Sequence, residues 1–347
     1  MQINSPPAWG EPVGRAVIRA CPENFIVHEQ LGFEPSGEGE HVFLHLEKRL
    51  LTTLELQERI ASFCAVPAMD IGFCGMKDRN AVTRQWFSVR LAGKTEPDWQ
   101  LLSEDSQVSV LSVQRHLRKL KRGVHRANNF QLRLSTVQAD VGLLEARLQT
   151  IREQGVPNYF GPQRFGRGGN TLVQARRWQS SGQRKITRKK RSLYLSALRS
   201  WIFNEMLTAR VQDHNWNTLL PGDYCMLQGS RSRFAYSADD TEVHDRLRQL
   251  DIHPGLPLWG SGAGIAAQDL PGITDEMILS CKFLEQEGLE VGYRATRLMA
   301  DDFCWEFCDD GSLHLQFSLV PGGYATAILA ELTEYSEGEV VGGDSGE

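Results

Sequence analysis

Residues 72–89 have the sequence Gly72-Phe73-Cys74-Gly75-Met76-Lys77-Asp78-Arg79-Asn80-Ala81-Val82-Thr83-Arg84-Gln85-Trp86-Phe87-Ser88-Val89, two apolar runs separated by a polar turn. The runs at 69–74 and 85–91 are typical of β-strands, and the turn between them places Lys77, Asp78 and Arg79 side by side. Flanking cations keep a carboxylate ionised, and a loop tied to two strands limits its motion. Asp78 is therefore a candidate nucleophile or base, although a solvated charged turn is the simpler interpretation of these residues alone.

Residues 75–85 resemble a family signature. The run Gly-Met-Lys-Asp-Arg-Asn-Ala-Val-Thr-Arg-Gln is similar to G-x-K-D-[RK]-x-A-x-T-x-Q, the signature of the TruD family of tRNA pseudouridine synthases. In that family the Asp is the catalytic nucleophile, and the resemblance assigns this role to Asp78. Further matching segments follow in the family's order, so the resemblance covers nearly all 347 residues.

The segment 19–27 resembles the family's K-x-x-P-E-D-F-x-V, which lines the active site. It departs from that pattern at Arg19, which replaces a Lys and changes the geometry of the charge, and at Asn24, which replaces an Asp. The resemblance predicts that Arg19 and Lys77 supply positive charge near the substrate and that Phe25 contacts it. From the residues alone, Phe25 would be a strand core residue and Arg19 a surface cation.

Two later segments complete the predicted substrate site. Residues 123–134 resemble G-N-x-F-x-[LIV], which implies that Asn128 orients the catalytic loop and that Phe130 stacks on the target base. Alternation alone leaves open whether Phe130 is a strand core residue. Residues 317–326 resemble F-x-L-P-x-G-x-[FY]-A-T, which implies that Tyr324 lies near the active site.

The chain length predicts two domains. We expect an α/β (α+β) fold, and the resemblance implies the mixed-sheet catalytic domain of pseudouridine synthases with an inserted α/β TRUD domain. The predicted parts are 1–155, the first catalytic segment; 156–293, the inserted domain; 294–335, the returning catalytic segment; and 336–347, an acidic, disordered tail.

Two helices have clear end signals. Thr52 and Glu55 have the spacing of a capping box before the apolar positions Leu56 and Ile60. A second helix follows Asp140, which can cap its first turn. These signals predict helices that begin at residues 53 and 141.

Basic residues gather in two blocks without Asp or Glu, at 115–126 and 164–199, although the net charge of the chain is −5. Either block alone is typical of a solvated face, but two such blocks in an acidic protein indicate a surface for phosphates. The predicted RNA-binding residues are Arg115, Arg118, Lys119, Lys121, Arg122, Arg126, Arg164, Arg188, Lys189, Lys190 and Arg191.

Other features argue against several classes of protein. No apolar run approaches membrane-spanning length, and residues 1–11 lack the pattern of a secretory signal. The seven cysteines form no CxxC pair, which predicts reduced thiols and no metal site. We therefore expect a cytoplasmic monomer without a membrane anchor or an obligate protein partner.

The predicted function is isomerisation of uridine, at position 13 of certain tRNAs, to pseudouridine by Asp78 after base flipping, without a cofactor. A non-catalytic RNA-binding protein is one alternative. A glycoside hydrolase is another, but it needs two carboxylates, and near Asp78 the sequence offers only Glu23 and Glu29.

Overall fold

The computed structural model describes residues 5–91, 93–104, 106–182 and 185–338. The chain folds into two compact units. The first, called the sheet unit here, comprises Val13–Leu144, Ala300–Pro321 and Thr333–Glu347. The second, called the helical unit, comprises Met1–Pro12, Glu145–Met299 and Gly322–Leu332.

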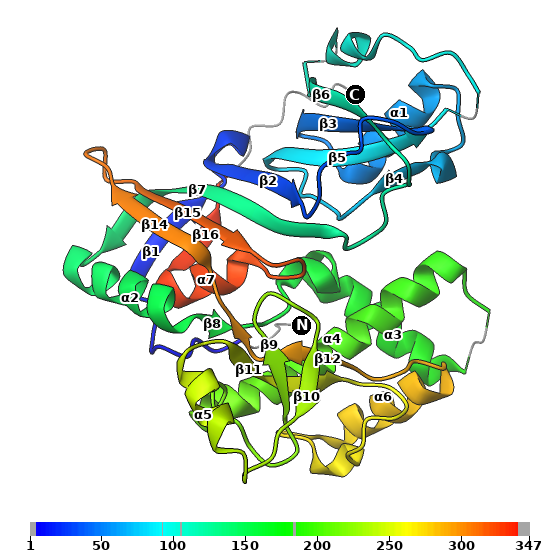
Figure 1. The fold of residues 1–347 in the computed structure, drawn as a ribbon. Helices are drawn as coiled ribbons and strands as arrows, with labels where there is room; N and C mark the ends of the chain where they lie inside the picture. The colour runs from blue at the N-terminus through cyan, green and yellow to red at the C-terminus, as the bar shows by residue number, and fades with distance from the viewer. Residues whose placement is uncertain (1–4, 92, 105, 183–184, 339–347) are drawn as a thin grey trace. The chain divides into compact units, whose positions relative to one another are not determined.

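The sheet unit is built on one mixed sheet with the order β14-β15-β7-β2-β5-β3-β6, to which β1, β4 and β16 are added (Figure 1). Most neighbours are antiparallel, but β2 pairs with β5 and β1 pairs with β16 in parallel. The strands are β1 (Gly14–Ile18), β2 (Phe25–Leu31), β3 (His41–Arg49), β4 (Ile71–Phe73), β5 (Val82–Arg90), β6 (Val108–His116), β7 (His125–Ala139), β14 (Asp301–Phe307), β15 (Leu313–Leu319) and β16 (Glu334–Glu337).

Helix α1 (Thr53–Phe63) covers one face of this sheet. Its predicted capping box is present: the Glu55 amide donates to Thr52 Oγ1 at 3.1 Å, and the Thr52 amide donates to Glu55 Oε2 at 2.6 Å. Leu56 and Ile60 are fully buried in the same cluster as Phe87 of β5. Burial of this apolar stripe, more than helix propensity, stabilises the helix on the sheet.

The strand register determines which side chains share the face of the sheet that carries α1. Phe25 of β2 lies opposite Leu132 of β7, and Phe130 of β7 lies opposite Phe317 of β15. Directly paired residues of antiparallel strands point to the same side. Three aromatic side chains predicted from separate segments therefore meet on one face.

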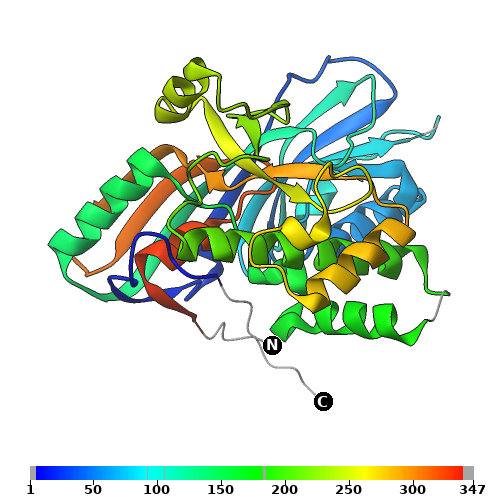
Figure 2. The ribbon, with the colours of Figure 1, turned by 90° about the horizontal axis from the view of Figure 1, so that it is seen from below.

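The helical unit combines packed helices with small sheets. Helix α4 lies beside α3 and α6 (Figures 1 and 2), and its buried residues dominate the core. The strands form the order β10-β9-β11-β12 and the pair β13-β8. The elements are α2 (Val141–Gln154), whose first turn belongs to the sheet unit, β8 (Val156–Pro157), α3 (Asn170–Ser181), α4 (Arg188–Gln212), β9 (Tyr224–Leu227), β10 (Arg233–Ala235), α5 (Thr241–Arg248), β11 (Ile252–Leu258), α6 (Asp275–Gln286), β12 (Gly292–Ala295), β13 (Arg297–Leu298) and α7 (Ala325–Leu332).

The second helix predicted from its end signals is α2. It begins at residue 141, and Asp140 Oδ1 accepts from the Leu143 amide at 2.8 Å. After the helix, Gly155 has a φ of +70°, a conformation that glycine adopts without steric cost. The α/β fold class is thus confirmed, and its predicted helix signals mark real helix ends.

The two compact units do not follow the predicted domain boundaries at 155/156 and 293/294, and that domain division stays a prediction. The predicted tail also differs at its start, because Glu334–Glu337 form β16 beside β1. Pairing with a strand more than 300 residues away in sequence satisfies backbone groups that local composition cannot reveal. Residues 339–347 of the tail lie outside the described residues. No helix in the described part of the chain is long and apolar enough to cross a membrane.

Candidate active site around Asp78

The loop that carries Asp78 connects β4 to β5 and is tied to both α1 and β5. The Lys77 amide donates to Thr53 Oγ1 at 2.8 Å, and Thr53 Oγ1 donates to Gln85 Oε1 at 2.9 Å. Gln85 Nε2 in turn donates to the Gly75 carbonyl at 3.4 Å. This chain of hydrogen bonds holds the loop at both ends and limits the motion of Asp78.

The Asp78 carboxylate is held by Arg19. Arg19 Nη2 donates to Asp78 Oδ2 at 2.8 Å; the Asp78 side chain is 38% exposed, whereas that of Arg19 is 9% exposed. The other end of the guanidinium, Nη1, contacts Glu337 of β16, and the guanidinium carbon lies 4.1 Å from the centre of the Phe25 ring. A buried cation thus orients a carboxylate that remains accessible from outside.

Lys77 points away from solvent. Its Nζ donates to Glu29 Oε2 at 2.6 Å and to Asn128 Oδ1 at 2.8 Å, and its side chain is 6% exposed. Glu29 Oε1 also accepts from the Trp86 amide at 3.1 Å. The contacts of Lys77 and Asn128 therefore anchor the loop, which fits the orienting role expected of Asn128. A direct contact between Lys77 and the substrate stays a prediction.

The same contacts bear on the glycoside hydrolase alternative. Glu29 is completely buried and bound by Lys77, and the Glu23 carboxylate pairs with Arg49 at 2.8 Å. A second catalytic carboxylate has to reach the sugar or its attacking water. Glu29 cannot do so in this arrangement.

Phe130 lies in an aromatic cluster beneath the site. Its ring is 5.3 Å from that of Phe317 in a stacked geometry and 6.2 Å from that of Phe25 in an edge-on geometry. Phe130 is 7% exposed, so most of its surface packs in the core. Both interpretations of Phe130 thus have a physical basis, and its stacking on a base stays a prediction.

Tyr324 belongs to the helical unit, and its contacts are described within that unit. Its hydroxyl accepts from Arg164 Nε at 3.1 Å, and its ring packs edge-on against Phe160 at 6.1 Å. Arg294 lies 4.1 Å from the Phe160 ring centre. Arg164 is therefore held in an aromatic and cationic cluster, and the substrate contact expected of Tyr324 stays a prediction.

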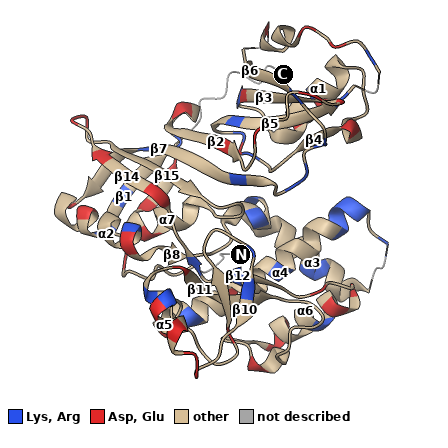
Figure 3. Cartoon of the chain, viewed as in Figure 1, with Lys and Arg blue, Asp and Glu red and all other residues tan. Residues whose placement is uncertain are grey.

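The predicted RNA-binding residues differ in how free their charges are (Figure 3). Arg115 pairs with Glu96, and Arg191 Nε donates to Glu287 Oε2 at 2.6 Å, so distant acids compensate both charges. Arg122 lies over the Phe73 ring at 3.8 Å. Lys119 donates to the Met69 carbonyl and is exposed. The others on exposed positions are Arg118, Lys121, Arg126, Arg188, Lys189 and Lys190.

Three buried side chains near the loop have atoms that can bind metals. Ligand atoms of Glu29, Cys74 and His125 lie within 4.8 Å of one another. Burial raises the pKa of the Cys74 thiol to about 12, however, and Lys77 already binds Glu29. Metal binding needs a thiolate and would place a second cation beside Lys77. This donor set therefore suits hydrogen bonding better than metal coordination.

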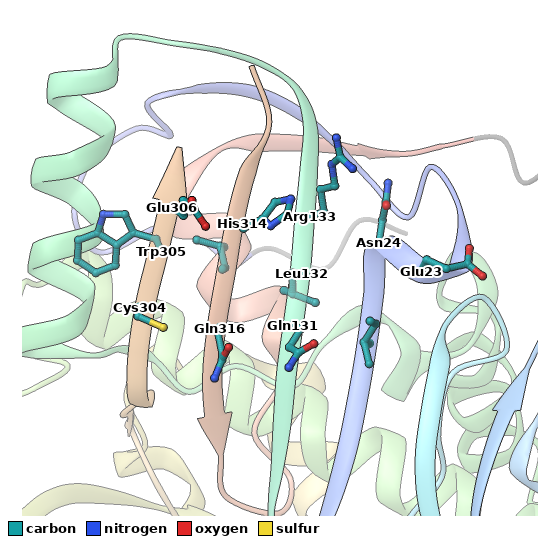
Figure 4. A pocket seen from close by; sticks show the side chains of 12 residues that line it. Glu23, Asn24, Gln131, Leu132, Arg133, Cys304, Trp305, Glu306, His314 and Gln316 are labelled. Carbon is teal, nitrogen blue, oxygen red and sulfur yellow. The ribbon is translucent and has the colours of Figure 1, made fainter. Parts of the chain in front are cut away.

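The opposite face of the sheet carries an open hollow of about 530 Å³ (Figure 4). Gln131 of β7 and Gln316 of β15 lie side by side there, beside Arg133 and His314. Gln131 alternates with Phe130 along β7, so the two side chains point to opposite faces. The hollow is thus a different surface from the site around Asp78.

Sequence reasoning missed two residues of the site, Lys48 and Glu337. Lys48 Nζ donates to the Asp78 carbonyl at 2.8 Å, and Lys48 is completely buried. A signal existed, because Lys48 occupies an inward position in the alternation of the strand at 41–48. Glu337 had no such signal, since its position depends on how β16 pairs with β1.

Together, the fold and the site define an α/β protein in which a mixed sheet presents a fixed, accessible carboxylate. The family model described as tRNA pseudouridine synthase D (TruD) matches residues 9–176 and 170–332. A tRNA pseudouridine synthase D of Methylococcus capsulatus is 46% identical over 334 residues, 95% of this chain and 94% of that protein. One of Nitrosococcus oceani is 43% identical over 331 residues, 94% and 92% of the two chains.

A crystal structure from Methanosarcina mazei that carries the name TruD has the same fold. Its TM-score is 0.64 with 19% sequence identity, and the match covers 95% of each chain. The chain described here belongs to the tRNA pseudouridine synthase D family, as its sequence motifs predicted.

Proposed function

We propose that this chain isomerises uridine to pseudouridine in tRNA, with Asp78 as the nucleophile and with the target nucleotide flipped out of the RNA. The observation that carries this proposal is the Asp78 carboxylate, bound by a buried guanidinium at 2.8 Å on a loop tied to the protein core. Membership of a family of isomerases supports it. By the resemblance, the substrate would be uridine 13 of certain tRNAs, and the chain would act in the cytoplasm as a monomer.

The reaction conserves the atoms of the nucleotide. The bond between ribose C1′ and uracil N1 breaks, the base rotates, C5 bonds to C1′, and the C5 proton leaves. Asp78 would attack either ribose C1′ or uracil C6, and both routes need an ionised carboxylate. Its ion pair with Arg19 favours that ionised form.

A base in the RNA stack is out of reach of a carboxylate held at a sheet face, so the nucleotide has to leave the stack. In this proposal, Phe130 supports the flipped base, Phe25 supports Arg19, and Asn128 holds Lys77 so that the loop keeps its shape. Tyr324 and Arg164 would contribute from the helical unit. The exposed cations would bind the tRNA backbone through its phosphates.

The test uses tRNA that carries tritium at uridine C5, because isomerisation releases this label to water. Asp78→Asn, which keeps the size of the side chain, should abolish release while tRNA affinity changes by no more than a few fold. An RNA-binding protein without catalysis would release no label in either form. Substantial turnover by Asp78→Asn would refute the role of Asp78.

A further inference from the structure

Lys48 has no role in the reaction described so far, yet its position calls for one. It lies near the end of β3, opposite Thr83 of β5, and points to the face that carries α1. It is completely buried, and its Nζ donates to the Leu51 carbonyl at 2.6 Å and to the Asp78 carbonyl at 2.8 Å. Its charged group thus joins the β3–α1 turn to the residue that carries the nucleophile.

A buried ammonium group is costly to the fold. Burial lowers the pKa of Lys48 to about 8, although the nearby Asp78 charge opposes this shift. A leucine or methionine could fill the same space without the desolvation cost. Buried charges of this kind concentrate at functional sites, where geometry matters more than stability.

Other hydrogen bonds join the same two segments. Arg79 Nε donates to the Leu50 carbonyl at 3.1 Å, and the Lys77 amide donates to Thr53 Oγ1 at 2.8 Å. The residues immediately before and after Asp78 are therefore attached to residues 50–53. Lys48 is the contact at Asp78 itself, and it is the one shielded from water.

We propose that Lys48 is a positioning residue for the reaction: its ammonium group holds the backbone of Asp78 against the β3–α1 turn, so that the carboxylate points at the nucleotide. This inference rests on the proposed function, in which Asp78 is the nucleophile. Lys48 need not touch the RNA in this role. Its removal should therefore affect kcat and leave tRNA binding intact.

The test compares Lys48→Met with Leu46→Ala, a buried position two residues earlier on the same strand and face. Lys48→Met keeps the length of the side chain and removes both hydrogen bonds, and we expect kcat to fall about 100-fold, the loss typical of a misplaced reacting group. KM and the tRNA dissociation constant should stay within about threefold of wild type. Leu46→Ala should lower stability but leave kcat within the same range.

Lys48→Gln gives an independent readout, because its amide can reach one of the two carbonyls. We expect its kcat to lie between those of wild type and Lys48→Met, and it replaces Lys48→Met if that variant does not fold. Equal loss of kcat in Lys48→Gln and Leu46→Ala, or full activity of Lys48→Met, would overturn the inference. Asp78→Asn is measured in parallel: if it stays active, the proposed nucleophile fails, whereas an inactive Asp78→Asn beside an active Lys48→Met refutes Lys48 alone.

Discussion

Glu29→Gln is expected to be one of the most destabilising conservative changes in the sheet unit. The Glu29 side chain is 0% exposed and the Lys77 side chain 6% exposed, with 2.6 Å between Oε2 and Nζ. Removing one partner of a buried ion pair leaves the other charge without compensation and costs about 3–5 kcal/mol. Gln also has one acceptor oxygen where Glu29 uses two, for Lys77 and for the Trp86 amide.

The matched control is Glu334→Gln, which breaks a pair with Arg15 at 3.1 Å whose side chains are 64% and 76% exposed. Exposed pairs contribute about 0–1 kcal/mol, so this change should be nearly neutral. Urea denaturation gives the free energies of unfolding, and hydrogen exchange at the Trp86 amide reports on the sheet unit directly.

A double variant makes the reasoning stricter. Glu29→Gln combined with Lys77→Met removes both charges, so it should be less destabilised than the two single changes predict together. Additive losses, or a loss for Glu29→Gln as small as that for Glu334→Gln, would show that the buried charge is not what the fold compensates.

Three further predictions concern stacking, pH and RNA binding. Phe130→Leu should lower turnover more than Phe317→Leu does, because base stacking contributes about 1–3 kcal/mol and only Phe130 is proposed to supply it; equal losses would leave Phe130 a core residue. Burial lowers the pKa of His253 to about 4, so between pH 6.5 and 4 the unfolded chain binds a proton that the folded chain does not, and stability should fall by up to about 3 kcal/mol as the pH drops through that range. Urea denaturation of His253→Gln should show a weaker pH dependence, and an unchanged one would contradict the assignment. Replacing residues 188–190 with Ser should flatten the salt dependence of tRNA affinity by about 0.7–0.9 log units per lost phosphate contact, whereas Arg191→Ser, already paired with Glu287, should change it less; equal slopes in all variants would mean that the first turn of α4 is only a solvated face.

Local sequence was a good guide to elements with local causes. The capping box at Thr52 and the cap at Asp140 use side chains within three residues of the groups they bind, so spacing alone predicted both helix starts. Contacts between distant segments were less accessible. The basic blocks contain no acids in sequence, yet Glu96 and Glu287 compensate Arg115 and Arg191.

The sequence by itself determined the catalytic loop, its family and the candidate nucleophile, because Asp78 and its neighbours lie within one short motif between two strands. Only the tertiary structure decided what holds that loop. Glu29, Lys48 and Glu337 come from three different strands, and their contacts with Lys77, Asp78 and Arg19 arise from strand pairing. Strand register acts between segments far apart in the chain, so local periodicity can indicate that a lysine points inward but cannot say what it meets there.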